Sequence, residues 1–317
     1  MSSEETMVSK LSPTTYRTLT TQLATALQTF QSSDAKFRVL KTITTTDLLP
    51  HDPIKLPPSE SPKTLFILDS SFNPPSIAHQ TLALSALANT SSTAHPKPHR
   101  LLLLFATMNA EKAPSAASFD QRLTLMTLFA TDLLSHLKEI PATHSVPTGI
   151  DIGVTNQPYY TDKSHAIDTE ATHENYPSQP AHVHMVGYDT LTRFLAPKYY
   201  PNFHPPLAAL EPFFSAGHGL RVTLRPDADF GSEEEQRAFV RRVESGEMER
   251  EGAKREWAGQ IEVVPANERT GVSSTRIRRA AKSGEWEVVG ELCTERVAAY
   301  VRSEGLYEGD DRGAKMA

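Results

Sequence analysis

Short apolar runs that alternate with helical patterns constrain the fold of this chain more than any other feature of its sequence. Near-continuous apolar runs are typical of strands covered on both faces, and apolar residues at helical spacing are typical of amphipathic helices. We expect strands at residues 64–69, 101–106, 150–154, 182–186, 220–224 and 261–264. We expect helices at 16–30, 76–88 and 119–137, from 190, within 232–257, and at 273–282 and 285–303. This alternation predicts an α/β fold, a Rossmann-like doubly wound parallel sheet with helices on both faces.

Polar and proline-rich segments suggest how the chain is divided. Residues 45–62 are rich in Pro, Asp and Ser, so we predict an N-terminal helical extension and linker over residues 1–62. The main domain is predicted at 63–309 and a disordered tail at 310–317. We expect insertions at about 89–99 and 155–181, and we interpret the second, polar one as a flexible excursion that could act as a substrate lid.

The composition excludes several classes of protein. Cys293 is the single cysteine of the 317 residues, so an internal disulfide and a cysteine zinc site are excluded. The net charge of -6 disfavours a nucleic-acid partner. No apolar run reaches the roughly 18 to 20 residues of a membrane helix, and the first ten residues lack the apolar core of a secretory signal. We therefore expect no membrane association and a location in the cytoplasm or nucleus.

The first segment that carries chemistry follows the strand expected at 64–69. It runs from Ser70 to His79 and reads Ser-Ser-Phe-Asn-Pro-Pro-Ser-Ile-Ala-His. Two consecutive prolines cannot donate to a sheet ladder, so they end the strand and stiffen a turn into the next helix. A helix start presents unpaired backbone N–H groups, which suit a phosphate. Ser76 is suited to cap this helix, and His79 in its first turn can donate to the same phosphate.

The second segment follows the last expected strand. Residues 272–279 read Val-Ser-Ser-Thr-Arg-Ile-Arg-Arg. Hydroxyl side chains at a helix start cap it and can reach phosphate oxygens. Thr275 and Arg278 are three residues apart and share a helical face, so the Arg278 guanidinium can bind the same phosphate. Alone, this pattern also fits a capped helix with a solvated basic face.

Together the two segments resemble the signature sequences of the nicotinamide mononucleotide adenylyltransferases, a family of the nucleotidylyltransferase superfamily, in a divergent form like its fungal branch. The resemblance extends over about residues 64–307 and implies a nucleotidylyltransferase domain. Ser70 stands where the family has a glycine. The family often stacks nicotinamide on a mid-chain tryptophan, which this chain lacks; an aromatic face could come instead from Tyr159, Tyr160 or Tyr188.

The resemblance implies a role for each matching residue. Catalytic roles fall to His79 and Arg278. ATP or phosphate binding falls to Ser71, Phe72, Ser76, Lys112, Ser273, Ser274, Thr275, Arg276 and Ile277. Contacts with the nucleotide or product fall to Ser70, Gly187, Asp189 and Arg225. Arg122 matches a family arginine that we interpret as structural or as supporting a residue that contacts the ligand.

The implied activity joins nicotinamide mononucleotide to the AMP part of ATP by in-line attack on the α-phosphate, which gives NAD and pyrophosphate. Mg²⁺ would travel with ATP, so no dedicated metal site is needed. The histidines at 165, 173, 182 and 184 lack a tight metal-ligand spacing, and we predict no metal site.

Two alternatives stay open. One is a sister transferase with another acceptor, such as nicotinate mononucleotide. The other is a nucleotide-binding regulatory protein or ATPase of the same fold. The expected partners are ATP and a mononucleotide, and a homo-oligomer, as found among relatives, also stays open.

Overall fold

One mixed sheet organises the chain. The computed structural model describes residues 12–45, 61–88, 95–107, 117–140, 144–171, 174–227, 229–266 and 272–309. The strands within these ranges are β1 (Phe37–Ile43), β2 (Thr64–Asp69), β3 (His99–Ala106), β4 (Ile150–Thr155), β5 (Ala181–Gly187), β6 (Gly219–Thr223) and β7 (Ile261–Val264). They form a seven-stranded sheet in the order β1-β4-β3-β2-β5-β6-β7, parallel except for β1. The predicted α/β fold is confirmed.

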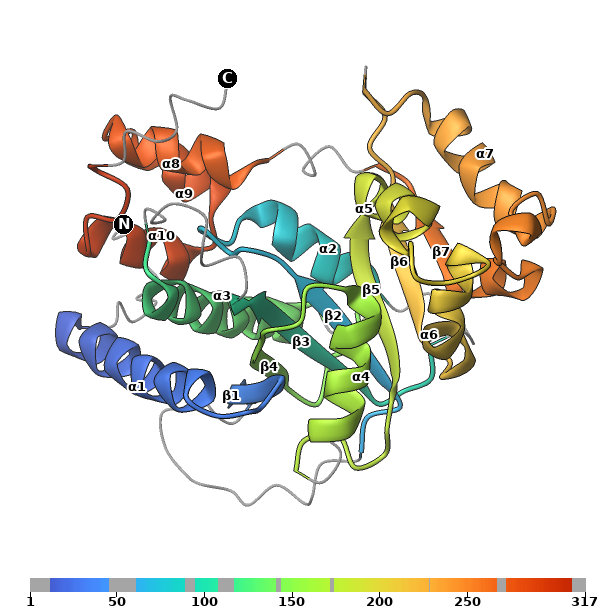
Figure 1. The fold of residues 1–317 in the computed structure, drawn as a ribbon. Helices are drawn as coiled ribbons and strands as arrows, with labels where there is room; N and C mark the ends of the chain where they lie inside the picture. The colour runs from blue at the N-terminus through green and yellow to red at the C-terminus, as the bar shows by residue number, and fades with distance from the viewer. Residues whose placement is uncertain are drawn as a thin grey trace.

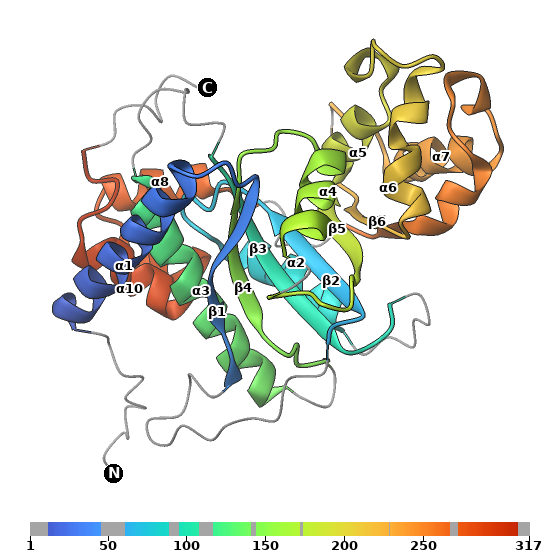
Figure 2. The same cartoon turned by 60° about the horizontal axis from the view of Figure 1, so that its bottom comes forward.

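Helices cover both faces of this sheet (Figure 1). The α-helices are α1 (Pro13–Gln31), α2 (Ile77–Leu87), α3 (Phe119–Glu139), α4 (Tyr160–Glu170), α5 (Tyr188–Phe194), α6 (Glu211–Ser215), α7 (Glu233–Glu244), α8 (Ser274–Lys282), α9 (Trp286–Leu292) and α10 (Glu295–Ser303). Short 3₁₀ turns are η3 (Pro197–Tyr199), η4 (Pro206–Leu210), η5 (Glu249–Glu251) and η6 (Arg255–Gln260). Figure 2 shows α5, α6 and α7 gathered beside β6 at one end of the sheet, with α1, α3, α8 and α10 at the other. None of these helices is long and apolar enough to span a bilayer.

Alternating side chains of the central strands face two separate cores. On β2, Phe66 and Leu68 pack into the cluster that includes α1, α2, α3 and the C-terminal helices. Leu65 and Ile67 point to the opposite face and pack with Ile167 of α4. All four side chains are almost fully buried, because a parallel strand in the middle of such a sheet is covered twice.

The N-terminal segment adds a strand that the sequence analysis does not predict. β1 pairs antiparallel with β4 at the edge of the sheet, and α1 packs against the main core through Leu23, Leu27 and Phe30. The signal for β1 is weak because Phe37–Ile43 carries three polar residues among seven, as an edge strand tolerates.

Two local expectations are wrong, and one is refined. The flexible excursion expected at 155–181 contains α4, whose Ala166 and Ile167 are buried against the sheet. The helical region expected within 232–257 is present as α7, which ends at Glu244, followed by η5 and η6; Gly246, just after α7, adopts a positive φ of 81°. The closing helix expected at 285–303 is divided into α9 and α10 by the capping residue Thr294. The predicted tail at 310–317 and residues 89–94 lie outside the described residues.

Candidate functional site

A cavity of about 490 Å³ lies beyond the carboxyl ends of the central strands. Its lining comes from the end of β2 (Asp69, Ser70 and Ser71), the end of β3, the first turns of α3 and α4, and α5. In the sheet order, β3 and β4 lie on one side of β2, whereas β5 lies on the other side. The cavity therefore lies at the point where the strand order reverses, which is where open α/β sheets bind ligands.

The turn after β2 is anchored by Phe72, whose side chain is buried in the core. Phe72 adopts a φ of 45° and is fully buried, with its ring beside that of His79. A positive φ is unfavourable for a bulky residue, so burial of this ring maintains the turn. Phe72 belongs to the core and does not line the cavity, so its part in the expected ATP site is to hold the turn. Ser71, in contrast, is exposed and lines the cavity.

His79 is fixed by the helix that it helps to begin. Ser76 is the N-cap of α2, and its backbone N–H donates to Nδ1 of His79 at 3.1 Å, as it would to a glutamate in a capping box. Because Nδ1 accepts, the neutral ring carries its proton on Nε2. Burial lowers the pKa of His79 to about 4, so the ring is neutral at pH 7. Its Nε2 lies 2.9 Å from the Ser70 hydroxyl.

The second motif lies against this turn. Ser273 caps α8, and its hydroxyl accepts from the Arg276 backbone N–H at 3.3 Å. Ser274 Oγ donates to the Pro74 carbonyl at 2.8 Å, and Arg278 Nη1 donates to the Asn73 carbonyl at 2.8 Å. Two segments about two hundred residues apart therefore meet at one turn.

The members of this motif have different exposures. Arg278 also donates to Thr275 Oγ1 at 3.2 Å, so these two side chains do share a helical face. Ser273 and Arg276 are exposed, whereas the Ile277 side chain is fully buried in the core. Lys112, expected to bind phosphate, lies outside the described residues.

Arg122 brings a positive charge to the cavity. Its guanidinium lies over the rings of Phe105 and Phe119, at 5.6 and 5.4 Å from their centroids, and its Nε donates to the Ala117 carbonyl at 3.2 Å. Within the described part of the chain, no carboxylate forms an ion pair with Arg122. Burial lowers its pKa, and Arg278 nearby acts in the same direction. Arg122 therefore packs on two aromatic rings and also lines the cavity.

The predicted nucleotide residues after β5 and β6 lie beside the cavity or outside it. Gly187 ends β5, and a side chain there would approach the Asp189 carboxylate to 2.8 Å. Asp189 forms an ion pair with Arg193, which lines the cavity. Arg225 follows β6, is largely exposed, pairs with Asp227 and does not line the cavity.

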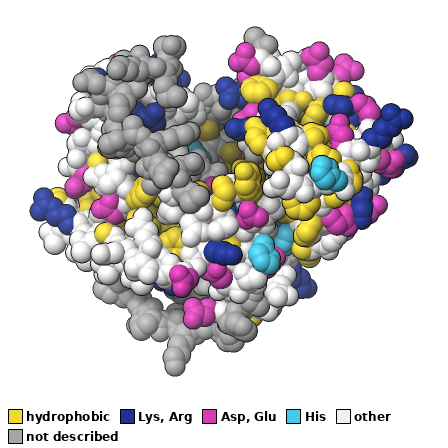
Figure 3. All heavy atoms as spheres, in the orientation of Figure 1, with side chains coloured by type: hydrophobic (Ala, Val, Ile, Leu, Met, Phe, Trp, Pro, Cys, Tyr) yellow, Lys and Arg dark blue, Asp and Glu magenta, His cyan; other side chains and the backbone are white. Residues whose placement is uncertain are grey.

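Aromatic side chains line the end of the cavity formed by α4 and α5. Tyr159, Tyr160, Tyr199 and Tyr200 all contribute to the lining, whereas Tyr188 packs away from it against Phe230 and Phe239. Tyr159 is 51% exposed, so its ring is open to a ligand. Figure 3, in the orientation of Figure 1, shows hydrophobic side chains exposed on the right half of the molecule, which contains α5 and α6.

Sequence reasoning missed one buried ion pair in the lining. Lys163 of α4 donates to Asp69 at the end of β2, and both side chains are at most 10% exposed. The Lys163 ammonium also lies 5.0 Å from the centroid of the Tyr160 ring. The only sequence signal was a carboxylate at the end of a buried strand, since nothing local indicates a partner 94 residues away.

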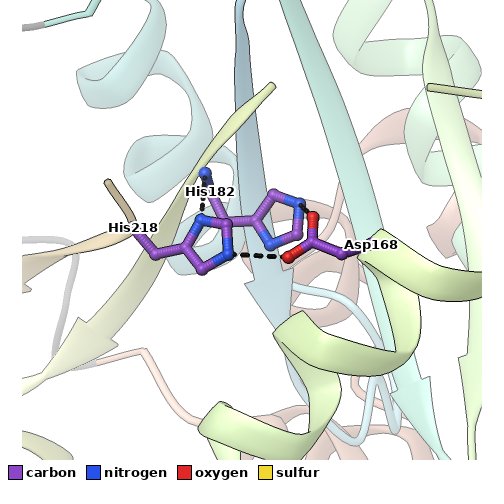
Figure 4. Close-up of side chains that lie close together, drawn as sticks. All are labelled: Asp168, His182 and His218. Carbon is purple, nitrogen blue, oxygen red and sulfur yellow. Dashed lines mark hydrogen bonds and ion pairs between the residues drawn. The ribbon is translucent and has the colours of Figure 1, made fainter. Parts of the chain in front are cut away.

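Three potential metal ligands meet under α4, as Figure 4 shows. Asp168 lies 3.0 Å from His218 Nε2 and 3.3 Å from His182 Nε2. The backbone N–H of His182 donates to His218 Nδ1, so His218 carries its proton on Nε2 and donates it to Asp168. The two imidazoles are stacked 4.0 Å apart and inclined by 3°. The ring planes are parallel, so in this arrangement the two imidazoles do not both point at one ion. Neither ring nitrogen of His182 has a hydrogen-bond partner within the described residues.

The chain is similar in sequence to a curated fungal protein. No family model matches the chain. A Schizosaccharomyces pombe protein described as "Putative nicotinamide mononucleotide adenylyltransferase" is 27% identical over 244 residues, which cover 76% of this chain and 85% of the relative. The resemblance to the nicotinamide mononucleotide adenylyltransferases is thereby confirmed.

Two solved structures align with most of this chain at low sequence identity. The Plasmodium falciparum nicotinic acid mononucleotide adenylyltransferase complexed with NaAD aligns over 78% of this chain and 98% of its own, with a TM-score of 0.47 and 13% identity. Thermotoga maritima TmcAL bound with alpha-thio ATP aligns over 76% of this chain and 56% of its own, with a TM-score of 0.35 and 15% identity.

Proposed function

We propose, with the resemblance to the nicotinamide mononucleotide adenylyltransferases as the premise, that this chain transfers the AMP part of ATP to nicotinamide mononucleotide and releases pyrophosphate. The observation that carries the proposal is the junction of the two motifs. Ser274 and Arg278 bind the turn that precedes His79. Ser70 and Ser71, at the start of the same turn, line the cavity at the switch point of the sheet, whereas residues 272–279 do not line it. This junction supports a single polyphosphate site built from both ends of the domain.

The reaction is an in-line displacement at phosphorus. An oxygen of the mononucleotide's 5′-phosphate forms a bond to the α-phosphorus of ATP, the bond from that phosphorus to the bridging oxygen breaks, and pyrophosphate leaves with that oxygen. ATP enters as its magnesium complex, so the metal belongs to the substrate. The chain needs no nucleophile of its own, because positioning and charge stabilisation supply the rate enhancement.

The cavity has two chemically different ends for the acceptor. Ser70, Ser71 and Arg122 provide hydroxyl and guanidinium donors at one end, where phosphates would lie. Tyr159, Tyr160 and their aromatic neighbours provide flat apolar faces at the other end, which suit a pyridine ring. The volume of about 490 Å³ is within the range of about 300 to 1,000 Å³ usual for small-molecule sites.

The test is a product assay on the purified chain. Incubation with MgATP and nicotinamide mononucleotide should give NAD, measured with alcohol dehydrogenase, and pyrophosphate in equal amounts. Parallel reactions contain nicotinate mononucleotide or 4′-phosphopantetheine. A dinucleotide formed only from nicotinate mononucleotide would replace the proposed acceptor. Phosphate release without pyrophosphate from any acceptor would overturn the proposal in favour of an ATPase.

A further inference from the structure

Both ring nitrogens of His79 already have partners within the protein. Nδ1 accepts from the Ser76 backbone N–H, and Ser76 Oγ lies 2.9 Å from the same nitrogen. Nε2–H points to Ser70 Oγ at 2.9 Å. A phosphate can therefore reach the imidazole only if it displaces the Ser70 hydroxyl.

The Ser70 hydroxyl can donate one hydrogen bond into the cavity. It accepts from His79 Nε2–H, so its own hydrogen remains available to donate. Within the described residues, no acceptor for that hydrogen is found, and Ser70 lines the cavity. The Ser70 backbone N–H donates to the Leu104 carbonyl of β3 at 3.2 Å, which holds the residue in place from the other side.

We propose that Ser70 donates a hydrogen bond to a phosphoryl oxygen of the bound nucleotide, and that His79 is a positioning residue that acts through Ser70. This inference rests on the proposed function. The hydroxyl lies between a fixed N–H donor and the anion, and a chain of hydrogen bonds polarises its members in this direction. An O–H donor to an anionic oxygen is short and strong. The serine thus takes over the phosphate contact and is not merely a bulkier substitute for the family's glycine.

The inference predicts a specific order of activities. Ser70→Ala removes the donor and leaves His79 Nε2–H without an acceptor, so kcat should fall about 100-fold, as on loss of one oxyanion donor. Ser70→Thr retains the hydroxyl and should restore most of that loss. Ser215→Ala, on the exposed end of α6, is the matched control and should keep the wild-type rate. An active Ser70→Ala variant would overturn the inference.

A double-mutant cycle distinguishes two cases. In the first, called the relay, His79 acts on the phosphate only through Ser70; in the second, His79 and Ser70 contact the substrate independently. His79→Gln keeps an acceptor for the Ser76 N–H and should lower kcat by about as much as Ser70→Ala. The double variant should be no slower than either single variant, because both remove the same contact. If the two losses multiply, His79 touches the substrate directly and the relay is wrong, although the proposed function survives.

A measurement without turnover keeps the relay testable if the proposed function fails. Calorimetric titration with pyrophosphate should show weaker binding to Ser70→Ala and recovery in Ser70→Thr. In NMR spectra of ¹⁵N-histidine-labelled protein, the His79 Nε2–H signal should shift when pyrophosphate binds to the wild type. Equal affinities and an unmoved signal would refute the relay, whereas an inactive wild type that passes both tests would refute only the transferase.

Discussion

At the scale of single residues, the chemistry of the site depends on which side-chain donors and acceptors are already hydrogen-bonded within the protein. His79 uses Nδ1 to cap α2, so it is a neutral donor and not a cation at pH 7. Arg278 uses two of its N–H groups on Asn73 and Thr275. Arg122 uses one N–H on Ala117, and its guanidinium makes no other hydrogen bond within the residues that the structure describes.

We therefore predict that the Arg122 side chain binds a phosphate of the substrate. Arg122→Ala should lower kcat/KM for the mononucleotide by about 10- to 100-fold, because a hydrogen bond to a charged group contributes about 1.5–3 kcal/mol. Arg122→Lys should be intermediate, since an ammonium cannot bind a phosphate through two parallel bonds. Arg302→Ala is the control, because Arg302 also covers an aromatic ring, that of Trp286, away from the cavity. Wild-type kinetics for Arg122→Ala would refute this role.

At the scale of elements, α4 is unusual because much of its buried side is polar. Lys163 meets Asp69, Ser164 Oγ lies 2.8 Å from His184 Nε2, and Asp168 contacts His218. The polar composition that suggested a flexible excursion instead matches polar groups on the sheet. The same helix carries Tyr160 into the cavity, so its position over the sheet affects the shape of the cavity.

The Lys163–Asp69 ion pair should stabilise the packing of α4 on the sheet, and its contribution to the free energy of unfolding can be measured. Lys163→Met should lower the free energy of unfolding by about 3–5 kcal/mol, because it leaves a buried carboxylate without its partner. The double variant Lys163→Met/Asp69→Leu should regain most of the loss, since both charges are then absent. Guanidinium denaturation measures both. A single-variant cost below about 1 kcal/mol, the level of an exposed pair, would contradict this account.

At the scale of the whole molecule, buried neutral histidines tie stability to pH. Burial lowers the pKa values of His79, His99, His182 and His184 below the usual 6.5. Above pH about 6.5 the folded and unfolded states bind equal numbers of protons at these rings. Below it, the unfolded state binds protons that the folded state excludes, so acid favours unfolding.

The expected result is a free energy of unfolding that is constant with respect to these histidines near pH 7.5 and falls steadily from pH 6.5 toward 4. Urea denaturation at pH 7.5, 6.5, 5.5 and 4.5 measures it. His184→Gln should reduce the slope, whereas His204→Gln, at an exposed position, should leave it unchanged. A stability independent of pH between 7 and 5 would show that these rings are accessible to protons.

The local pattern of residues was enough to predict the central architecture. The strands β2 to β5 and the turn after β2 depend on residues within a few positions of one another, so a short stretch of sequence is enough to predict them. The same holds for the cap Ser76, which lies where it was expected, and for the expectation that a hydroxyl caps the helix near residue 273, where Ser273 is the cap. The strand β1 escaped prediction because an edge strand buries one face weakly and carries little periodicity.

Partners across the fold were decided by tertiary structure alone. Asp69 meets Lys163, and Ser274 meets Pro74, only because sheet order and crossovers bring distant segments to one edge. The hydrogen bond between Ser70 and His79 is close in sequence, yet it depends on the tautomer that capping of α2 imposes on the ring. The sequence gives the type of each residue directly. The direction of a hydrogen bond depends on the donors and acceptors that the folded chain brings around that residue.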